Sequence, residues 1–275
     1  MSQSRDSDRI DNMVARVLAT VPHSLQPYVN ECRWTRITIG KSPAATFRLD
    51  QAGHAALYLK VSPMSHRREL LRESERVTWL QGKLPVPEVI HYDADDRNEF
   101  LLLTALPGRD AASLIEDRPN ETIVRLLATG LRRIHTVSIE NCPFDMTLEG
   151  LIEEARFNVA NNLVNEADFD EIRLGRSAAE IFEEMQSKRP ADEDLVFTHG
   201  DYCLPNVIID GENVAGFVDW GSAGVADRYR DIALVVRSLA RNTGEDLARS
   251  FYTAYGLSRP DTEKVTYYQL LDEFW

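Results

Sequence analysis

The sequence contains little cysteine and no long apolar run. Its three cysteines, Cys32, Cys142 and Cys203, are widely spaced among 275 residues and form no CxxC pattern. This spacing predicts reduced thiols and gives little support to a zinc site. No segment approaches the roughly 18 consecutive apolar residues of a membrane span, and the polar N-terminal stretch has no signal-peptide core. We therefore expect a soluble, cytoplasmic protein.

Positive charge is also scarce. The chain has 31 basic and 44 acidic residues, which gives a formal net charge of −13. Nucleic acids and anionic membranes bind a cationic face, so neither is expected as the main partner, whereas a cationic ligand is compatible with this charge. A hydrophobic content of 43% and a charged content of 27% are ordinary for a globular enzyme, and the length allows one large domain or two lobes.

Short strand patterns dominate the first half of the chain, after an expected helix over 10–20. Runs rich in β-branched and aromatic residues predict a meander, followed by one helix and two further strands. The expected strands are 32–39, 44–50, 55–61, 85–93 and 98–106, with the helix over 66–81.

From residue 107 onward the pattern is mostly helical. Apolar residues recur at helical spacing in 120–137, and further helices are expected near 148–163, 177–188, 227–241, 245–255 and 260–273. The only strands expected in this half are 195–199, 206–210 and 214–220. Strands first and helices later predict an α+β fold with two lobes, residues 1–105 and 106–275.

One stretch, VFTHGDYCLPNVIID (196–210), places polar residues between two apolar segments. Asp201 and Asn206 lie in its middle, and Asp219 follows in GFVDWG. Magnesium prefers hard oxygen ligands, usually one or two from protein, so Asn206 and Asp219 suit a metal and Asp201 remains to face a hydroxyl group. A lone Asp is more often a turn or cap residue, but the three together favour a catalytic site.

Lys60 lies in the apolar run LYLKVS, where an unpaired lysine would be costly to bury. In the following helix, Glu73 falls on the inward face, whereas Glu69 is one turn away and Glu75 points elsewhere. A Lys60–Glu73 pair would hold the ammonium group where phosphates can bind. The alternative is a lysine that extends to solvent beside a boundary glutamate.

Two further features are compatible with a nucleotide. Tyr58 shares a strand face with Lys60 and could lie against a flat base, although a core tyrosine is commoner. The segment GKSPA (40–44) could offer backbone N–H groups to phosphate, or be an ordinary hairpin turn.

These residues together resemble the protein-kinase-like fold. The catalytic loop reads HGD followed by Asn206, and the later motif is VDWG, a combination typical of small-molecule antibiotic kinases. Within that group the chain resembles the aminoglycoside 3′-phosphotransferases over residues 30–275, most specifically in HGD and the terminal YYQLLDEFW.

The resemblance implies an ATP- and magnesium-dependent kinase that modifies the 3′-hydroxyl of aminoglycosides and confers antibiotic resistance in bacteria. Asp201 would orient or deprotonate that hydroxyl, and Asn206 and Asp219 would hold two magnesium ions. The nucleotide contacts that it implies are Lys60, placed by Glu73, on the α- and β-phosphates, Ser42 on the β-phosphate, Tyr58 stacked on adenine, and backbone hydrogen bonds from Thr104 and Leu106.

The resemblance also implies an acidic pocket for the polycationic antibiotic, formed by Asp168, Glu171, Asp272, Glu273 and the carboxylate of Trp275. An acidic run such as EADFDE is otherwise typical of a solvated loop. The protein is expected to act as a monomer or weak dimer.

Two positions depart from the family pattern. Ser222 stands where the family usually has arginine, and Arg241 and Asn242 stand where it usually has an acidic pair. Loss of acidic groups and gain of a cation would narrow the range of aminoglycosides. The phosphoryl-transfer residues are unaffected, so we expect catalysis to be retained.

Other functions remain open on residues alone. The same reaction on choline, a macrolide or a sugar is disfavoured by the acidic pocket residues and the LLDEFW ending. A module that only binds nucleotide has no use for Asp201. A protein kinase is disfavoured because no long activation segment ending in APE follows Asp219.

Overall fold

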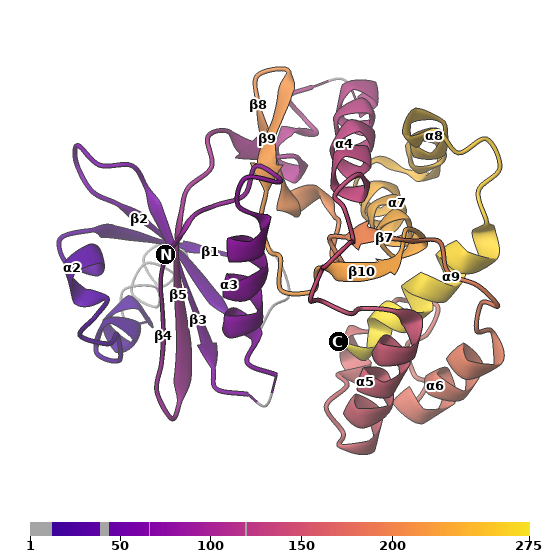
Figure 1. Cartoon of the computed structure of the whole chain (residues 1–275), viewed down its shortest axis with the longest axis horizontal. Coiled ribbons are helices and arrows are strands. Elements are labelled where there is room, and N and C mark those ends of the chain that lie inside the picture. The colour runs from indigo at the N-terminus through magenta and orange to yellow at the C-terminus, as the bar shows by residue number, and fades with distance from the viewer. Residues whose placement is uncertain (1–12, 39–43, 66, 119) are drawn as a thin grey trace, which may run out of the picture. The chain divides into compact units, whose positions relative to one another are not determined.

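The computed structural model describes residues 13–38, 44–65, 67–118 and 120–275. The chain divides into two compact units. Unit 1 comprises Met1–Pro107 with Gly216–Gly221, and unit 2 comprises Gly108–Ala215 with Ser222–Trp275. The mixture of an antiparallel sheet unit and a largely helical unit is the expected α+β fold (Figure 1).

Unit 1 is built on a five-stranded antiparallel sheet in the order β1-β2-β3-β5-β4. The strands are β1 (Arg33–Ile37), β2 (Ala45–Asp50), β3 (Leu57–Pro63), β4 (Val89–Ala94) and β5 (Asn98–Thr104). The first three form the predicted meander, and all five lie within the expected segments to within two residues. Short α2 (Gln26–Val29) precedes the sheet, and α3 (Glu69–Leu80) connects β3 to β4.

The two faces of this sheet have different roles. Leu59 and Val61 of β3 join a buried apolar cluster with Phe47, Leu49, Phe100 and Leu102, which packs against Val21, Leu25 and Val29 near α2. Because side chains alternate along a strand, Tyr58 and Lys60 point to the opposite face, where α3 packs against β3, β4 and β5. Figure 1 shows α2 and α3 on opposite sides of the strands.

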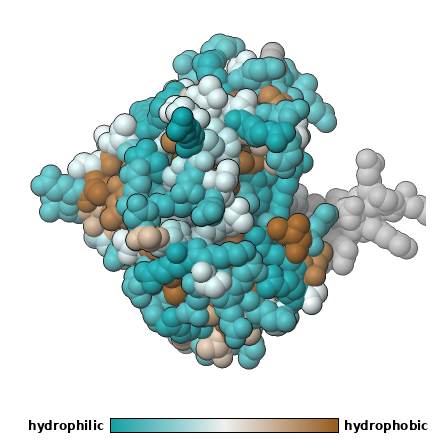
Figure 2. Space-filling view, turned by 90° about the vertical axis from the view of Figure 1, so that its right-hand side faces the viewer, coloured by the Kyte–Doolittle hydropathy of each residue, from teal (hydrophilic) through white to brown (hydrophobic). Residues whose placement is uncertain are grey.

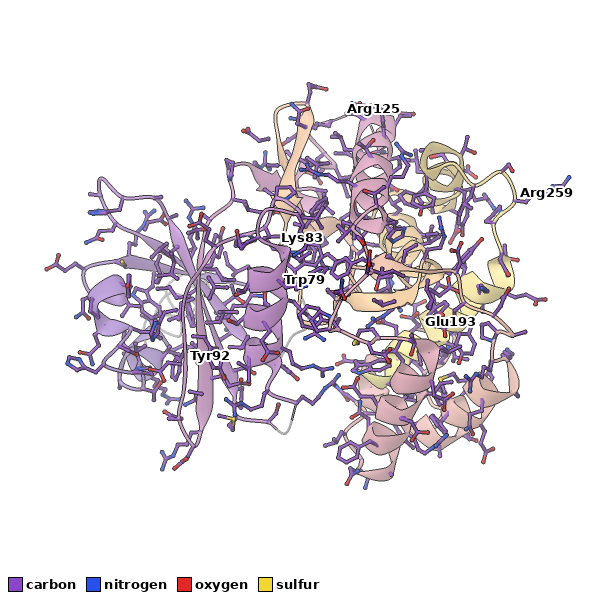
Figure 3. All side chains as sticks on the ribbon, viewed as in Figure 1. Trp79, Lys83, Tyr92, Arg125, Glu193 and Arg259 are labelled. Carbon is purple, nitrogen blue, oxygen red and sulfur yellow. The ribbon has the colours of Figure 1, made fainter. Side chains whose placement is uncertain are left out.

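A buried carboxylate fixes the start of α3. Glu99 of β5 is fully buried and accepts hydrogen bonds from the Leu71 N–H at 3.3 Å, from Arg68 at 3.3 Å and from Tyr92 at 2.8 Å. A carboxylate is favourable at the positive end of a helix dipole. The N-cap residue of α3, Arg68, makes no capping hydrogen bond with its side chain, and Glu99 accepts a backbone N–H of the first turn instead. At the other end of α3, the Lys83 ammonium lies 4.0 Å from the centre of the Trp79 ring (Figure 3).

Unit 2 contains six α-helices among the residues described. They are α4 (Asn120–His135), α5 (Leu148–Ala160), α6 (Ala178–Ser187), α7 (Tyr229–Thr243), α8 (Glu245–Tyr255) and α9 (Thr262–Leu271). Helix α7 packs against α8 and α9, and α4 packs against α8. These helices match the predicted segments, and α4, α7 and α8 in particular have a clear apolar face of helical period.

The strands after residue 107 correct one expectation. β7 (Leu195–Thr198), β8 (Val207–Asp210) and β9 (Asn213–Phe217) were predicted, but β6 (Arg109–Asp110) and β10 (Gly224–Asp227) were not. β10 pairs with β7, and the remaining three form a sheet in the order β6-β8-β9. Strands of two and four residues are too short to show an alternation of apolar and polar residues. They form because they pair with distant segments and not because of their local sequence.

Along the parts of the chain that the structure describes, no helix combines the length and apolarity required to cross a membrane. The face shown in Figure 2 is mostly hydrophilic, and its hydrophobic side chains occur in separate small groups.

Candidate active site

In unit 1, the Lys60 ammonium forms a buried ion-pair centre. Its Nζ donates hydrogen bonds to both carboxylate oxygens of Glu73, at 2.7 and 2.8 Å, and also to the carboxylate of Asp219. Lys60 and Glu73 are 8% and 4% exposed. The Lys60–Glu73 pair expected from the sequence is therefore present, and the structure adds Asp219 as a second partner.

Charge explains why this lysine can be buried. Burial opposes the charged form of Lys60, but the two neighbouring carboxylates outweigh it and raise the pKa of the ammonium group. Lys60 is thus a fixed cation at neutral pH. The position of Glu73 on the inward face of α3, opposite the Lys60 face of the sheet, creates this arrangement.

Asp219 occupies a strained backbone position. A strand was expected over 214–220, but β9 ends at Phe217, so Asp219 lies two residues beyond the strand. Asp219 has φ of 65°, in the left-handed region that non-glycine residues seldom adopt. Such strain is commonly found at functional sites, and here it accompanies the contact between Asp219 and Lys60.

In unit 2, Asp201 follows β7 in a loop whose neighbouring residues are buried. His199 and Tyr202 are fully buried, whereas Asp201 is exposed. The Asn206 side-chain amide donates to Asp201 twice, to its backbone oxygen and to its carboxylate, both at 2.9 Å. The structure therefore brings Asp201 and Asn206 together and holds the carboxylate in one orientation.

Asp231, in the first turn of α7, holds this loop from beneath. Its two carboxylate oxygens accept the backbone N–H groups of His199 at 2.8 Å and Gly200 at 2.7 Å. His135 lies 3.1 Å from the same carboxylate, and its other ring nitrogen lies 2.6 Å from the Tyr255 hydroxyl. Burial would raise the pKa of Asp231, but the hydrogen bonds and charge of the two histidines lower it, so the carboxylate stays ionised.

Gly200 is the residue that lets the loop pass so close to its neighbours. Its φ is +82°, and a Cβ at this position would collide with the carbonyl group of Ser222. His199 contributes its Nδ1, which accepts the Asp201 N–H at 3.3 Å. Both histidines therefore contact the groups that hold the loop: His199 binds the Asp201 N–H, and His135 lies against Asp231.

Each unit offers one oxygen ligand of a kind that magnesium takes. In unit 2, Asn206 directs its amide nitrogen at Asp201, which leaves its Oδ1 for a ligand. In unit 1, Asp219 offers a carboxylate. Across the residues described, no cluster of three or more His, Cys, Asp and Glu side chains forms a metal site. Magnesium usually takes only one or two ligands from protein and others from phosphate, so the chemistry of each residue by itself is compatible with that ion.

The other residues expected to contact the nucleotide are Tyr58, Thr104 and Leu106, which lie in unit 1, and Ser42, which lies outside the described residues. Tyr58 is half-buried on β3 beside its cross-strand partner Arg48, which hydrogen-bonds it. The Thr104 N–H already donates to the Glu88 carbonyl at 3.0 Å, so this N–H is occupied. Leu106 follows two residues later and is half-buried.

The candidate pocket residues are not free acids. Asp272 pairs with Arg237, Glu273 accepts from Arg173 at 2.9 Å, and Asp168 accepts from Asn165 at 2.7 Å. Burial raises the pKa of Glu273. Glu171 is exposed, and Trp275 is 43% exposed.

Sequence reasoning missed the supporting residues. Asp231 could have been found from the sequence, because it directly precedes the apolar run IALVV. An acidic residue beside such a buried run needs a partner for its charge. Arg173 and Arg237 carried no comparable signal, because their partner residues lie 100 and 35 positions away in the chain.

Comparison with known proteins gives a consistent family. A model of the phosphotransferase enzyme family matches residues 33–268. An aminoglycoside 3′-phosphotransferase of Niallia circulans is 38% identical over 255 residues, which are 92% of this chain and 97% of that protein.

Solved structures agree. The crystal structure of an aminoglycoside-3′-phosphotransferase of type VIII superposes with a TM-score of 0.82 at 35% identity, covering 92% of this chain and 97% of that one. APH(3″)-Id of Streptomyces rimosus, solved with ADP and streptomycin, gives a TM-score of 0.75 at 27% identity over 91% of this chain and 96% of its own. The chain is a kinase of the phosphotransferase enzyme family and belongs to the aminoglycoside 3′-phosphotransferases.

Proposed function

We propose that this protein uses ATP to phosphorylate the 3′-hydroxyl of aminoglycosides of the kanamycin and neomycin type, and so confers resistance to them. The observation that carries the proposal is the exposed Asp201 carboxylate, oriented by Asn206 in an otherwise buried loop. A carboxylate that is exposed and oriented in this way is suited to meet a substrate hydroxyl. The family relationship supports the identity of that substrate.

The nucleotide contacts follow from unit 1. Lys60, held by Glu73, binds the α- and β-phosphates as a fixed cation. Tyr58 stacks on adenine, and Thr104 accepts a hydrogen bond through its carbonyl while Leu106 donates through its N–H. Ser42 contacts the β-phosphate.

Asn206 and Asp219 would hold two magnesium ions. Bound magnesium neutralises charge on the phosphates and orients them for transfer. For Asp219 this role requires that its contact with Lys60 be shared with, or given up to, the metal.

The reaction is an in-line displacement. Asp201 accepts a hydrogen bond from the 3′-hydroxyl and thereby directs the oxygen of that hydroxyl at the γ-phosphorus. A bond forms between that oxygen and phosphorus, the bond from phosphorus to the β,γ-bridging oxygen breaks, and ADP leaves. The hydroxyl proton passes to Asp201 or to the transferred phosphoryl group. Catalysis is therefore mostly positioning and charge neutralisation.

The antibiotic is proposed to bind in unit 2. Its ammonium groups face the carboxylates of Asp168, Glu171, Asp272 and Glu273 and the end of the chain at Trp275. Residues 1–105 would form the nucleotide-binding lobe and 106–275 the catalytic and antibiotic-binding lobe. We further propose a cytoplasmic monomer or weak dimer.

An ATP-consumption assay with kanamycin, neomycin, choline and erythromycin tests the function. We expect turnover with the two aminoglycosides and none with choline or erythromycin. Absence of turnover with every aminoglycoside would refute the proposal, and turnover with choline or erythromycin instead would reassign the substrate.

A further inference from the structure

Three arginines and three carboxylates form a compact ion-pair cluster in unit 2. It joins the loop after Asp168, helix α7 and the turn at 272–274. We call it the Asp170 cluster, and its members are Asp170, Arg173, Arg237, Arg241, Asp272 and Glu273. Formal charges within it balance, with three cations against three anions.

The inner part of the Asp170 cluster is structural. Arg173 and Glu273 have side chains only 6% and 4% exposed and pair at 2.9 Å. Glu273 also accepts the backbone N–H of Asp170 at 3.0 Å, which fixes the loop. Removal of either charge would leave the other buried without its partner, so this pair stabilises the fold whether or not Glu273 also faces an antibiotic ammonium group.

Arg237 occupies an intermediate position. Its side chain is 19% exposed, and it contacts both Asp272 and Asp170, the latter at 3.5 Å. Burial opposes its charge, but Asp272 and Asp170 outweigh burial and raise its pKa. A substrate cation would displace this guanidinium only at considerable cost.

Arg241 differs from the other two arginines. Its side chain is 53% exposed, and it reaches from the last turn of α7 to Asp170, whose side chain is only 18% exposed. An exposed guanidinium therefore covers a partly buried carboxylate. Because solvent partly screens the Arg241 guanidinium, this ion pair can be broken at less cost than the buried Arg173–Glu273 pair.

We propose that Arg241 is a specificity-determining residue that acts as an internal competitor for an ammonium group of the aminoglycoside. It occupies Asp170 and brings the charge of the cluster to zero. A substrate ammonium must displace Arg241 or forgo Asp170, and either outcome weakens its binding. This inference rests on the proposed function, because it assumes a polycationic substrate at these acids.

The test compares Arg241→Gln with the unsubstituted enzyme on neomycin and kanamycin. Loss of the guanidinium frees Asp170, so KM for the antibiotics should fall about three- to tenfold, while KM for ATP changes less than twofold. Arg241→Lys keeps the cation and should keep KM near that of the unsubstituted enzyme. Arg249→Gln removes another exposed arginine, which pairs with Asp246, and controls for net charge.

A double substitution shows whether Arg241 acts through Asp170. In an Asp170→Asn background, Arg241→Gln should no longer lower KM, because the competed carboxylate is gone. A general change in surface charge would lower KM equally in both backgrounds.

The outcomes separate cleanly. An unchanged or raised KM for both antibiotics in Arg241→Gln would overturn the inference, as would an equal effect of Arg249→Gln. If the unsubstituted enzyme fails to turn over any aminoglycoside, the proposed function fails instead. If Arg241→Gln folds poorly, Arg241→Lys still tests the inference. This variant keeps the cation, so a change of about threefold or more in KM for the antibiotics would contradict competition by charge.

Discussion

Asp201 is an exposed residue with buried neighbours in the chain. It is exposed between buried His199 and Tyr202, and Asn206 restrains its carboxylate. We expect Asp201→Ala to lower kcat by about a hundredfold to ten-thousandfold, because general base and orienting groups contribute on this scale. Nucleotide affinity, measured by calorimetry, should change little.

Asp210→Ala is the matched control for this substitution. Asp210 ends β8, nine residues after Asp201, and its side chain is exposed. It should leave both kcat and nucleotide affinity unchanged. If Asp201→Ala keeps most of its turnover, the role assigned to Asp201 is wrong.

Glu73 provides a second prediction for a single residue. Glu73→Gln keeps the size of the side chain but removes one of the two anions that hold Lys60. The ammonium would then lean towards Asp219, away from its phosphate-binding position. We expect KM for ATP to rise about tenfold or more, with a smaller change in KM for the antibiotic.

Glu75→Gln on the same helix is the comparison variant, since Glu75 is exposed. It should behave as the unsubstituted enzyme in steady-state kinetics. Equal increases in KM for ATP and for antibiotic in Glu73→Gln would point to general unfolding of unit 1 and contradict a specific role in placing Lys60.

At the scale of elements, helix α7 supports the catalytic loop through one carboxylate. Asp231 accepts two backbone N–H groups, and an asparagine has only one acceptor atom for them. Asp231→Asn would leave one buried N–H without an acceptor, at a cost of about 1–3 kcal/mol in the free energy of unfolding. We also expect kcat to fall more than either KM, because the loop carrying Asp201 loses its fixed position.

The pH dependence gives this prediction a sign. The pKa of Asp231 is lowered in the folded state, so its carboxylate stabilises the fold above the ordinary value of 3.8. That contribution is lost as the pH falls through the lowered pKa. The gap in unfolding free energy between the unsubstituted protein and Asp231→Asn should be full at pH 7 and narrow below about pH 4.

Denaturant titrations at several pH values measure this gap. Asp246→Asn, at a 98% exposed side chain on α8, is the control and should show no gap at any pH. A gap of constant size down to pH 2 would contradict an ionised Asp231 as the source of the stabilisation.

Helices and strands with a clear hydrophobic periodicity were predictable from the sequence. Ion pairs were predictable only when the two residues lie close together in the chain. Helix α8 was expected over 245–255 and occupies Glu245–Tyr255, and Lys60 was matched to Glu73 across 13 positions. By contrast, β10 forms only by pairing with β7, and the arginines on Asp272 and Glu273 come from distant segments. Pairing between distant segments leaves no local sequence pattern. Asp272 and Glu273 were therefore expected to be free to bind a ligand, although each already pairs with an arginine.

At the scale of the whole molecule, the net charge of −13 becomes relevant to the proposed substrate. A polycationic antibiotic is attracted to an anionic protein, whereas ATP is repelled by it and, in the proposed function, would be held at short range by Lys60 and magnesium. Attraction over the surface is screened within about 10 Å at 0.1 M salt, but contacts at a buried lysine are screened less.

Ionic strength should therefore act on the two substrates unequally. On raising the salt from about 0.05 to 0.5 M, kcat/KM for neomycin should fall about tenfold or more, while kcat/KM for ATP should fall less or rise slightly. Steady-state assays with each substrate varied in turn, at constant free magnesium, measure both values. Sodium chloride and potassium chloride should give the same result, because screening depends on ionic strength rather than on the identity of the cation. A parallel decline for neomycin and ATP would show that salt acts on the fold or on the chemical step, and would remove net charge as a factor in antibiotic capture.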